Sequence, residues 1–262
     1  MRKLLFIFLL ISNSCFAQEW VAEVMVGVSG YNGDLTQQRV AFNTMRPAGS
    51  INLKYNTGNF INFRGGISFG SVAGNDKYNT QANLKARNLN FKTNILEANA
   101  GVEIPLIDPL AYYAYPYIFG TLGVFHFNPY SYDNNNVKTY LQPLSTEGEG
   151  LPQYPGRKKY SLTQVCIPVG VGWKWIINEK LEICYEFGYR FLFTDYLDDV
   201  SKSYINLDVL AQAKGPKAVE MAYRKDVPFI EEGLPRGGPT RNDSYFFTGI
   251  KLGLVLGQGS KN

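Results

Sequence analysis

Short segments in which apolar side chains alternate with small or polar ones recur along this chain. Successive side chains of a β-strand point to opposite faces, so the alternation places the apolar residues of each segment on one face. Residues 60–72 show the pattern most clearly. Their apolar positions are Ile61, Phe63, Ile67 and Phe69, and between them lie Asn62, Arg64, Gly66, Ser68 and Gly70. Strands of about ten such residues span a bilayer when they close into a barrel.

Eight segments follow this alternation, and turn residues such as those at 56–59 and 178–179 separate them. We predict strands over residues 20–31, 46–55, 60–72, 91–104, 115–127, 161–175, 181–194 and 244–256. The fold class is therefore all-β, an eight-stranded antiparallel transmembrane β-barrel of the outer membrane. The fifth segment is apolar on both faces, and there we assign Tyr117, Phe119, Phe125 and Phe127 to the outer side.

Charged side chains concentrate on the face opposite the apolar one. They are Glu23, Glu97, Glu103, Glu182, Glu186, Lys54, Arg64, Lys174, Arg190 and Lys251. A soluble barrel of the lipocalin type has its apolar residues inside, so this order favours lipid outside and a polar lumen. An eight-stranded barrel is just wide enough for its side chains to fill, and these acids and bases are expected to pair as an ionic plug. The alternative is that these charged side chains form a row that conducts solutes or relays protons.

The connections alternate in length, as they do in outer-membrane barrels. Short turns near 56–59, 105–114 and 177–179 are expected on the periplasmic side. Long loops at 32–45, 73–90, 128–160 and 195–243 are expected outside the cell. Loops of this length are usually functional.

The first residues read as a secretory signal peptide. Arg2 and Lys3 precede an apolar stretch, and small residues follow up to Ala17. We expect cleavage after Ala17, which leaves residues 18–262 as a single barrel domain in the cell outer membrane. Lipid attachment at Cys15 is the alternative. No later segment has the roughly 18 apolar residues of a membrane-spanning helix.

The net charge of +4 does not come from a basic run with interleaved aromatic residues, so no nucleic-acid partner is expected. The densest basic cluster is Arg157, Lys158 and Lys159. It is expected to be a solvated loop, with contact to anionic lipopolysaccharide as the alternative.

Few residues suggest catalysis or metal binding. His126 is the single histidine, and no Ser and carboxylate near it in sequence complete a triad. The expected register separates Cys166 from Cys184, so we predict small lumenal side chains and no disulfide. The acidic residues at 195–199 could bind calcium, although their spacing differs from that of an EF-hand and favours a hydrogen-bonded loop. We therefore predict no enzyme and no cofactor.

Two loop motifs resemble those of the PorG-type outer-membrane proteins of the type IX secretion system, a DUF6089-like family of small barrels. The first consists of Pro143, Leu144, Ser145, Thr146, Glu147, Gly148, Glu149 and Gly150. The second comprises Asp195, Tyr196, Leu197, Asp198, Asp199, Val200 and Ser201, preceded by Tyr189 and Arg190. Segments at 116–129, 167–172 and 236–247 add weaker similarity. Unlike many outer-membrane barrels, the chain does not end on an aromatic residue.

This resemblance implies a non-enzymatic component of protein secretion, and of gliding in some members, that couples a periplasmic ring of PorK and PorN proteins to the outer membrane. The expected partners are outer-membrane lipids and these ring proteins. A small-solute channel and a lipid-modifying barrel enzyme are the alternatives.

Overall fold

The computed structural model describes residues 19–36, 41–58, 60–225, 231–238 and 240–256. The expected signal peptide at 1–17 and the last residues, 257–262, lie outside this part. Eight long strands form the body of the protein. They are β1 (Glu19–Asn32), β2 (Arg46–Asn56), β3 (Asn62–Asn75), β4 (Asn90–Pro105), β5 (Ala114–His126), β8 (Thr163–Asn178), β9 (Leu181–Leu192) and β10 (Ser244–Val255).

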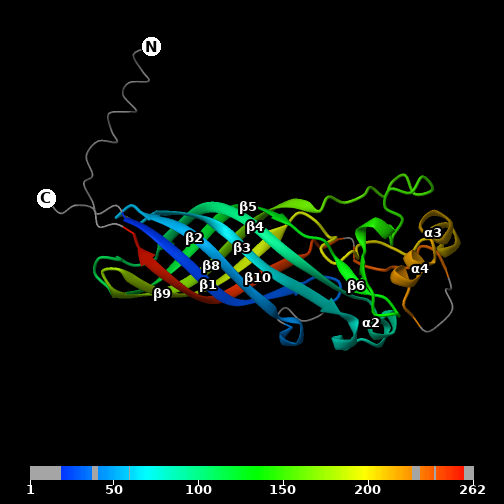
Figure 1. Cartoon of the computed structure of the whole chain (residues 1–262), viewed down its shortest axis with the longest axis horizontal. Coiled ribbons are helices and arrows are strands. Elements are labelled where there is room, and N and C mark those ends of the chain that lie inside the picture. The colour runs from blue at the N-terminus through cyan, green and yellow to red at the C-terminus, as the bar shows by residue number, and fades with distance from the viewer. Residues whose placement is uncertain (1–18, 37–40, 59, 226–230, 239, 257–262) are drawn as a thin grey trace, which may run out of the picture.

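These eight strands close into one antiparallel barrel (Figure 1). Consecutive strands pair with each other around the sheet, and β1 pairs with β10, as Gly27 opposite Gly249 illustrates. The predicted eight-stranded antiparallel barrel is confirmed, and strand bounds differ from those expected by at most three residues. Short turns gather at one end, here called the turn end, and long connections at the other, the loop end (Figure 1).

The outer face of the barrel is apolar, as the alternation predicts. Ile67 is 54% exposed and Ile250 is 62% exposed, although both are aliphatic and lie within regular strands. The intervening residues point inward and are buried, among them Arg64, Ser68 and Lys251. So many exposed aliphatic and aromatic side chains are stable only in contact with lipid. Among the described residues, no helix is long and apolar enough to cross a bilayer.

The facing expected for the fifth strand is wrong. Tyr117, Phe119, Phe125 and Phe127 are all buried inside the barrel, with exposures of 6% or less. The outward residues of β5 are instead the aliphatic ones between them, and Leu122 is 71% exposed. Because both faces of this strand are apolar, periodicity alone does not distinguish them.

Glycines on the neighbouring strand explain why the aromatic residues of β5 point inward. Gly170 lies directly opposite Phe119, and Gly172 directly opposite Tyr117. Residues directly opposite each other in a ladder share a face. A Cβ atom at Gly172 would lie 2.2 Å from the Tyr117 ring, so the missing side chain makes the space that this ring occupies. Large and small lumenal residues therefore alternate across the β5–β8 pair.

The long connections carry secondary structure of their own. β6 (Tyr130–Tyr132) extends the sheet beyond β4 and pairs with β7 (Lys138–Tyr140). Helices α2 (Ala82–Arg87), α3 (Leu207–Lys214) and α4 (Pro216–Ala222) lie at the loop end, with the 3-10 turns η1 (Phe42–Thr44), η2 (Asp76–Tyr78) and η3 (Gln142–Leu144) (Figure 1). Leu210, Ala218 and Ile205 form a small apolar core between α3, α4 and the preceding loop. We call these structured connections the cap.

Candidate functional site

Ion pairs fill the lumen near the turn end. The Lys54 Nζ atom lies 2.5 Å from a Glu182 oxygen and 3.2 Å from a Glu23 oxygen. Lys174 pairs with Glu103 at 2.7 Å. Each of these side chains is at most 4% exposed. Charges buried this deeply are tolerated only when paired, and here each ammonium group has more than one carboxylate within reach.

Glu186 joins this group to the middle of the lumen. Its carboxylate accepts two hydrogen bonds from the Arg64 guanidinium, at 2.8 and 3.1 Å. Lys251 and the Tyr117 hydroxyl donate to the same carboxylate, at 3.0 and 2.8 Å. The guanidinium also lies 4.2 Å from the centre of the Phe119 ring, a cation–π contact. The inward Tyr117 and Phe119 are thus part of the ionic network.

A separate pair lies nearer the loop end. Arg190 donates from Nε to Glu97 at 3.1 Å, and the Tyr245 hydroxyl donates to the same carboxylate at 2.7 Å. The Arg190 guanidinium also lies 4.4 Å from the Phe247 ring centre. The structure thus places every charged lumenal residue named from the sequence inside the barrel and in an ion pair.

Aromatic rings close the lumen on the loop-end side of the ion pairs. Phe125 stacks on Phe127 with 5.4 Å between ring centres, and Phe127 stacks on Tyr160 of the cap at 6.2 Å. Phe125 and Tyr245 are fully buried. Ion pairs and rings together leave the lumen filled with side chains, as expected for a barrel of eight strands.

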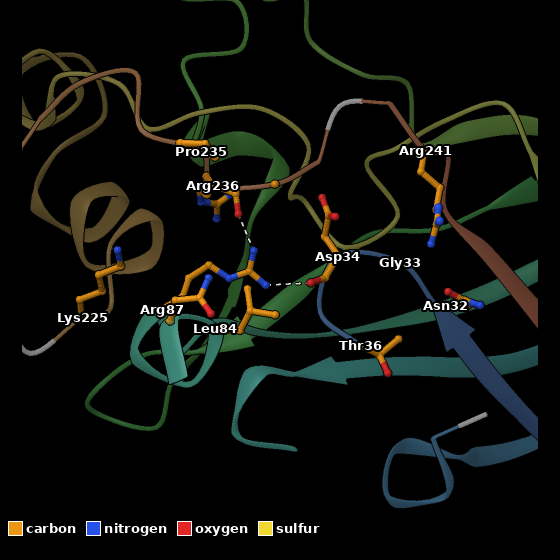
Figure 2. A pocket seen from close by; sticks show the side chains of 12 residues that line it. Asn32, Gly33, Asp34, Thr36, Leu84, Arg87, Lys225, Pro235, Arg236 and Arg241 are labelled. Carbon is orange, nitrogen blue, oxygen red and sulfur yellow. Dashed lines mark hydrogen bonds between the residues drawn. The ribbon is translucent and has the colours of Figure 1, made fainter. Parts of the chain in front are cut away.

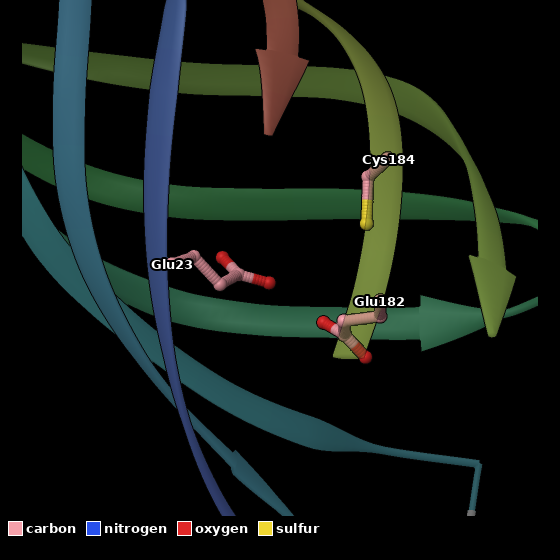
Figure 3. Close-up of side chains that lie close together, drawn as sticks. All are labelled: Glu23, Glu182 and Cys184. Atoms are coloured by element: carbon pink, nitrogen blue, oxygen red, sulfur yellow. The ribbon is translucent and has the colours of Figure 1, made fainter. Parts of the chain in front are cut away.

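One group of potential metal ligands occurs among the described residues, and it lies in the lumen. It consists of Glu23, Glu182 and Cys184 (Figure 3). Lys54 already pairs with both carboxylates, and Lys251 lies 2.6 Å from Glu23. Because these ammonium groups occupy the position that a cation would take, the arrangement is an ion-pair cluster.

The two motif loops contact each other in the cap. The Glu147 carboxylate accepts hydrogen bonds from the backbone N–H groups of Ser201 and Lys202, at 3.0 and 2.8 Å. The Arg236 guanidinium lies 3.1 Å from the same carboxylate. Glu147 is fully buried. One glutamate of the first motif therefore holds the end of the second motif and a third segment together.

A second contact between the motifs centres on Asp199. The Thr146 hydroxyl donates to one carboxylate oxygen at 2.5 Å, and the Tyr160 hydroxyl donates to the other at 2.6 Å. Tyr160 also stacks on Tyr196, with ring centres 4.7 Å apart. Residues more than 50 positions apart in sequence thus form one buried network.

The backbone of the first motif turns sharply to reach these partners. Pro143 and Leu144 end the 3-10 turn η3, and Ser145 then takes a left-handed conformation with φ of 54°. Gly148 and Gly150 have φ of 83° and 75°. Side chains with a Cβ rarely adopt such values, so these two glycines allow the loop to fold back on itself.

The second motif is also tied to the barrel rim. Asp198 accepts a hydrogen bond from the Tyr31 hydroxyl at 2.5 Å and from the Val200 N–H at 2.8 Å. Asp243, just before β10, accepts from the Leu197 N–H at 2.9 Å. The Asp198 and Asp199 carboxylates thus bind different partners, whereas both Asp195 carboxylate oxygens are buried and make no hydrogen bond within the described part of the chain.

Burial raises the pKa of several carboxyl groups in the cap. It raises the pKa of Glu149 to about 8, of Asp195 to about 7 and of Asp199 to about 6, with nearby carboxylates adding to the shift. The pKa values of Asp198 and Asp243 also lie well above the ordinary value, chiefly because both groups are buried. The cap therefore retains protons at pH values where exposed carboxyl groups are ionised.

A polar cavity of about 570 Å³ lies between the rim of β1, α2 and the segment around Arg236 (Figure 2). Arg87 crosses it, donating to the carbonyls of Arg236 and Asp34 and pairing with Asp76 at 2.7 Å. Arg87 is thus already bound to protein groups and holds α2 against the rim and the segment around Arg236.

The other residues singled out from the sequence, a histidine, two cysteines and two lysines, lie apart from the cap network. His126 is exposed on the outer face of β5, and its Nδ1 atom lies 3.0 Å from the Thr163 hydroxyl. Cys166 is opposite Leu192, and Cys184 is opposite Lys174, so the two thiols lie at different levels of the barrel. Lys158 and Lys159 are exposed as expected.

Arg157 corrects the expectation of a solvated triplet. Its guanidinium donates to the carbonyls of Glu147 and Ser203, at 2.7 Å each, and to the Ser203 hydroxyl at 2.8 Å. It therefore links the first motif loop to Ser203.

A sequence family described as a domain of unknown function, DUF6089, matches residues 1–212 of the 262 in this chain. The chain belongs to the DUF6089 family. No curated protein matches it in sequence.

Three solved structures illustrate what this DUF6089 protein is similar to in shape. Neisserial surface protein A has 8% identity and a TM-score of 0.46, over 90% of this chain and 96% of that one. Ail, the attachment invasion locus protein of Yersinia pestis, has 9% identity and a TM-score of 0.44, over 92% and 100%. A major outer membrane protein from Thermus thermophilus has 9% identity and a TM-score of 0.43, over 90% and 99%.

Several residues of the DUF6089 cap network were not expected from sequence. Tyr31, Asp76, Arg87 and Tyr160 are buried and bonded to the network, yet no local pattern sets them apart from other loop residues. The useful signal was the motif composition itself, because Gly and acidic residues within a long loop indicate a fixed backbone.

Proposed function

We propose that this DUF6089 protein is a structural, non-enzymatic component of the type IX secretion machinery in the outer membrane. In this role it couples a periplasmic ring of PorK and PorN type to the membrane and supports export of proteins with a C-terminal sorting signal. One observation carries the proposal. The two motifs that resemble the PorG-type proteins meet in a single buried network through Glu147 and Asp199. Asp198 of the second motif ties this network to Tyr31 at the barrel rim.

The filled lumen supports a structural role over transport through the barrel. A conducting pore needs a continuous water-filled path, whereas Lys54, Arg64 and Glu186 are paired across the lumen and buried. The outer face is apolar around the whole barrel, which supports residence in the outer membrane. A folded cap on a closed barrel offers a fixed surface at the loop end and short turns at the other.

The test is deletion of the protein followed by measurement of sorted cargo at the cell surface. We expect cargo to accumulate in the periplasm and wild-type protein to restore its delivery. Complementation with Glu147→Gln should restore less, since Gln replaces a carboxylate that binds two N–H groups and a guanidinium. Glu231→Gln, a change of the same kind at an exposed cap position, is the matched control. Normal export in the deletion strain would refute the proposal.

Purification of a tagged copy from solubilised envelopes tests the partner directly. Ring proteins of PorK and PorN type should be recovered with the wild-type protein. If the deletion strain delivered cargo normally and no ring proteins were recovered with the tagged copy, the barrel would serve neither in export nor in coupling the ring to the membrane.

A further inference from the structure

A second cavity, of about 230 Å³, lies at the outer rim of the barrel, between η1 and the loop-end part of the β3–β4 pair. Three cationic side chains line it: Arg46 at the start of β2, Lys77 in η2 and Lys92 near the start of β4. Neutral amides and the Tyr78 and Tyr132 rings complete the wall. No carboxylate occurs among the described residues that line it.

These cations have no ionic partner in the part of the chain that the structure describes. The Arg46 Nε atom is buried and makes no hydrogen bond. The Lys77 Nζ atom lies 4.7 Å from the Tyr78 ring centre, and the Lys92 Nζ atom 5.5 Å from the Tyr132 ring centre. Ring faces attract ammonium groups but do not neutralise them, so the cavity keeps its positive charge. This distinguishes it from the lumen, where carboxylates bind the cations.

Along the membrane normal, the cavity lies at the height of the lipid headgroups. On the outer face, Phe69 and Leu96 are opposite each other and more than half exposed, at the loop-end edge of the apolar surface. Lys92 precedes Leu96 by four positions in β4 and therefore lies nearer the loop end. Four residues of a strand tilted by about 40° rise roughly 10 Å along the membrane normal. That step places the cavity just outside the hydrocarbon core, where phosphate groups of membrane lipids lie.

We propose that Arg46, Lys77 and Lys92 form a binding site for a phosphate group. Arg supplies a planar fork of donors and the lysines supply point charges, which is the combination that binds phosphate oxygens. The phosphate belongs to a lipid headgroup of the outer leaflet or to a free phosphate ion. This site is separate from the cap network, so it stands whether or not the protein serves secretion.

The test compares the full-length protein with two triple variants in nanodiscs of zwitterionic lipid. Arg46→Gln, Lys77→Gln and Lys92→Gln together remove the site. Lys85→Gln, Lys180→Gln and Lys214→Gln together make the same change of charge at exposed positions that do not line the cavity. Heat-modifiable migration on gels checks that each barrel is folded. The two probes are bisphosphorylated lipid A, with its dephosphorylated form for comparison, and inorganic phosphate.

Wild type and the control variant should bind phosphorylated lipid A at least about tenfold more tightly than the site variant, as loss of three cations at a membrane surface implies. Weak binding of dephosphorylated lipid A would locate recognition in the phosphate. Binding of inorganic phosphate that the site variant loses, with no preference for the lipid, would assign the site to the free ion. Equal binding by wild type and the site variant, or equal weakening in both variants, would overturn the proposal.

Discussion

The stability lost when a barrel residue is substituted depends on the face on which that residue lies. An outward side chain meets lipid, and an inward one meets ion pairs, so neighbours in sequence have opposite requirements. Ile67 and Ser68 illustrate this, because the first is 54% exposed and the second is 2% exposed. Depth in the membrane adds a second variable, since charge costs most near the midplane.

Val171→Arg should destabilise the barrel by about 2–4 kcal/mol, because Val171 is 55% exposed midway along β8 and the change places a charge in lipid near the midplane. Ile177→Arg is the matched control. Ile177 is equally exposed, at 53%, but lies at the turn end, where the same change should cost about 0–1 kcal/mol. Urea titration in lipid vesicles measures both. Equal losses for the two variants would contradict the assigned membrane level.

Arg64→Leu should cost about 3–5 kcal/mol, because it leaves the buried Glu186 and Glu103 carboxylates short of a partner. The double variant Arg64→Leu with Glu186→Leu removes both charges of the closest pair and should recover part of the loss. The free energy of unfolding in detergent or lipid gives both values. A double variant less stable than the single one would argue against an unpaired charge as the cause.

At the scale of elements, the cap is a folded unit whose parts come from distant segments. The loops before β8 and after β9 meet through Glu147 and Asp199, and Arg236 approaches from a later part of the β9–β10 connection. The stability of the cap depends on buried carboxyl groups, some of which keep a proton. The cap is therefore expected to respond to pH more than the barrel strands do.

Raising the pH from about 5 to about 8 should loosen the cap. Folding raises the pKa of Glu149 to about 8, of Asp195 to about 7 and of Asp199 to about 6. The folded cap thus binds protons more tightly than the unfolded loops do. The resulting stabilisation is complete below the ordinary carboxyl pKa of about 4 and disappears as pH rises through these values.

Hydrogen exchange, corrected for the intrinsic effect of pH, measures this response in the two motif loops. Glu149→Gln removes one of the titrating groups and should reduce the pH dependence, with the β1–β10 strands as an internal reference. Greater protection of the motif loops at pH 8 than at pH 5 would show that the sign is wrong.

At the scale of the whole molecule, a barrel with a filled lumen is expected to be closed. Ion pairs near the turn end, the Arg190–Glu97 pair and the aromatic layer follow each other along the axis. In planar bilayers the purified protein should give no stepwise conductance, while an open porin in the same set-up does. Reproducible single-channel steps from the folded protein would restore the channel hypothesis.

The sequence by itself determined the barrel. Period-two alternation with uncharged apolar residues on one side is sufficient to predict eight strands, their bounds and seven of their facings, because lipid and lumen select opposite side chains. The charged residues of the lumen were identified for the same reason. Periodicity carries no information where both faces are apolar, and this is why the facing of β5 could not be predicted.

Only the tertiary structure decided which residues meet. Phe119 faces inward because the β5–β8 register places it opposite Gly170, and register is a property of two strands together. Likewise Glu147, Ser201 and Arg236 look like ordinary loop residues until the chain brings them into one network. Local sequence encodes the preference of a residue for lipid, water or a turn, whereas contacts between distant segments depend on how the whole chain closes.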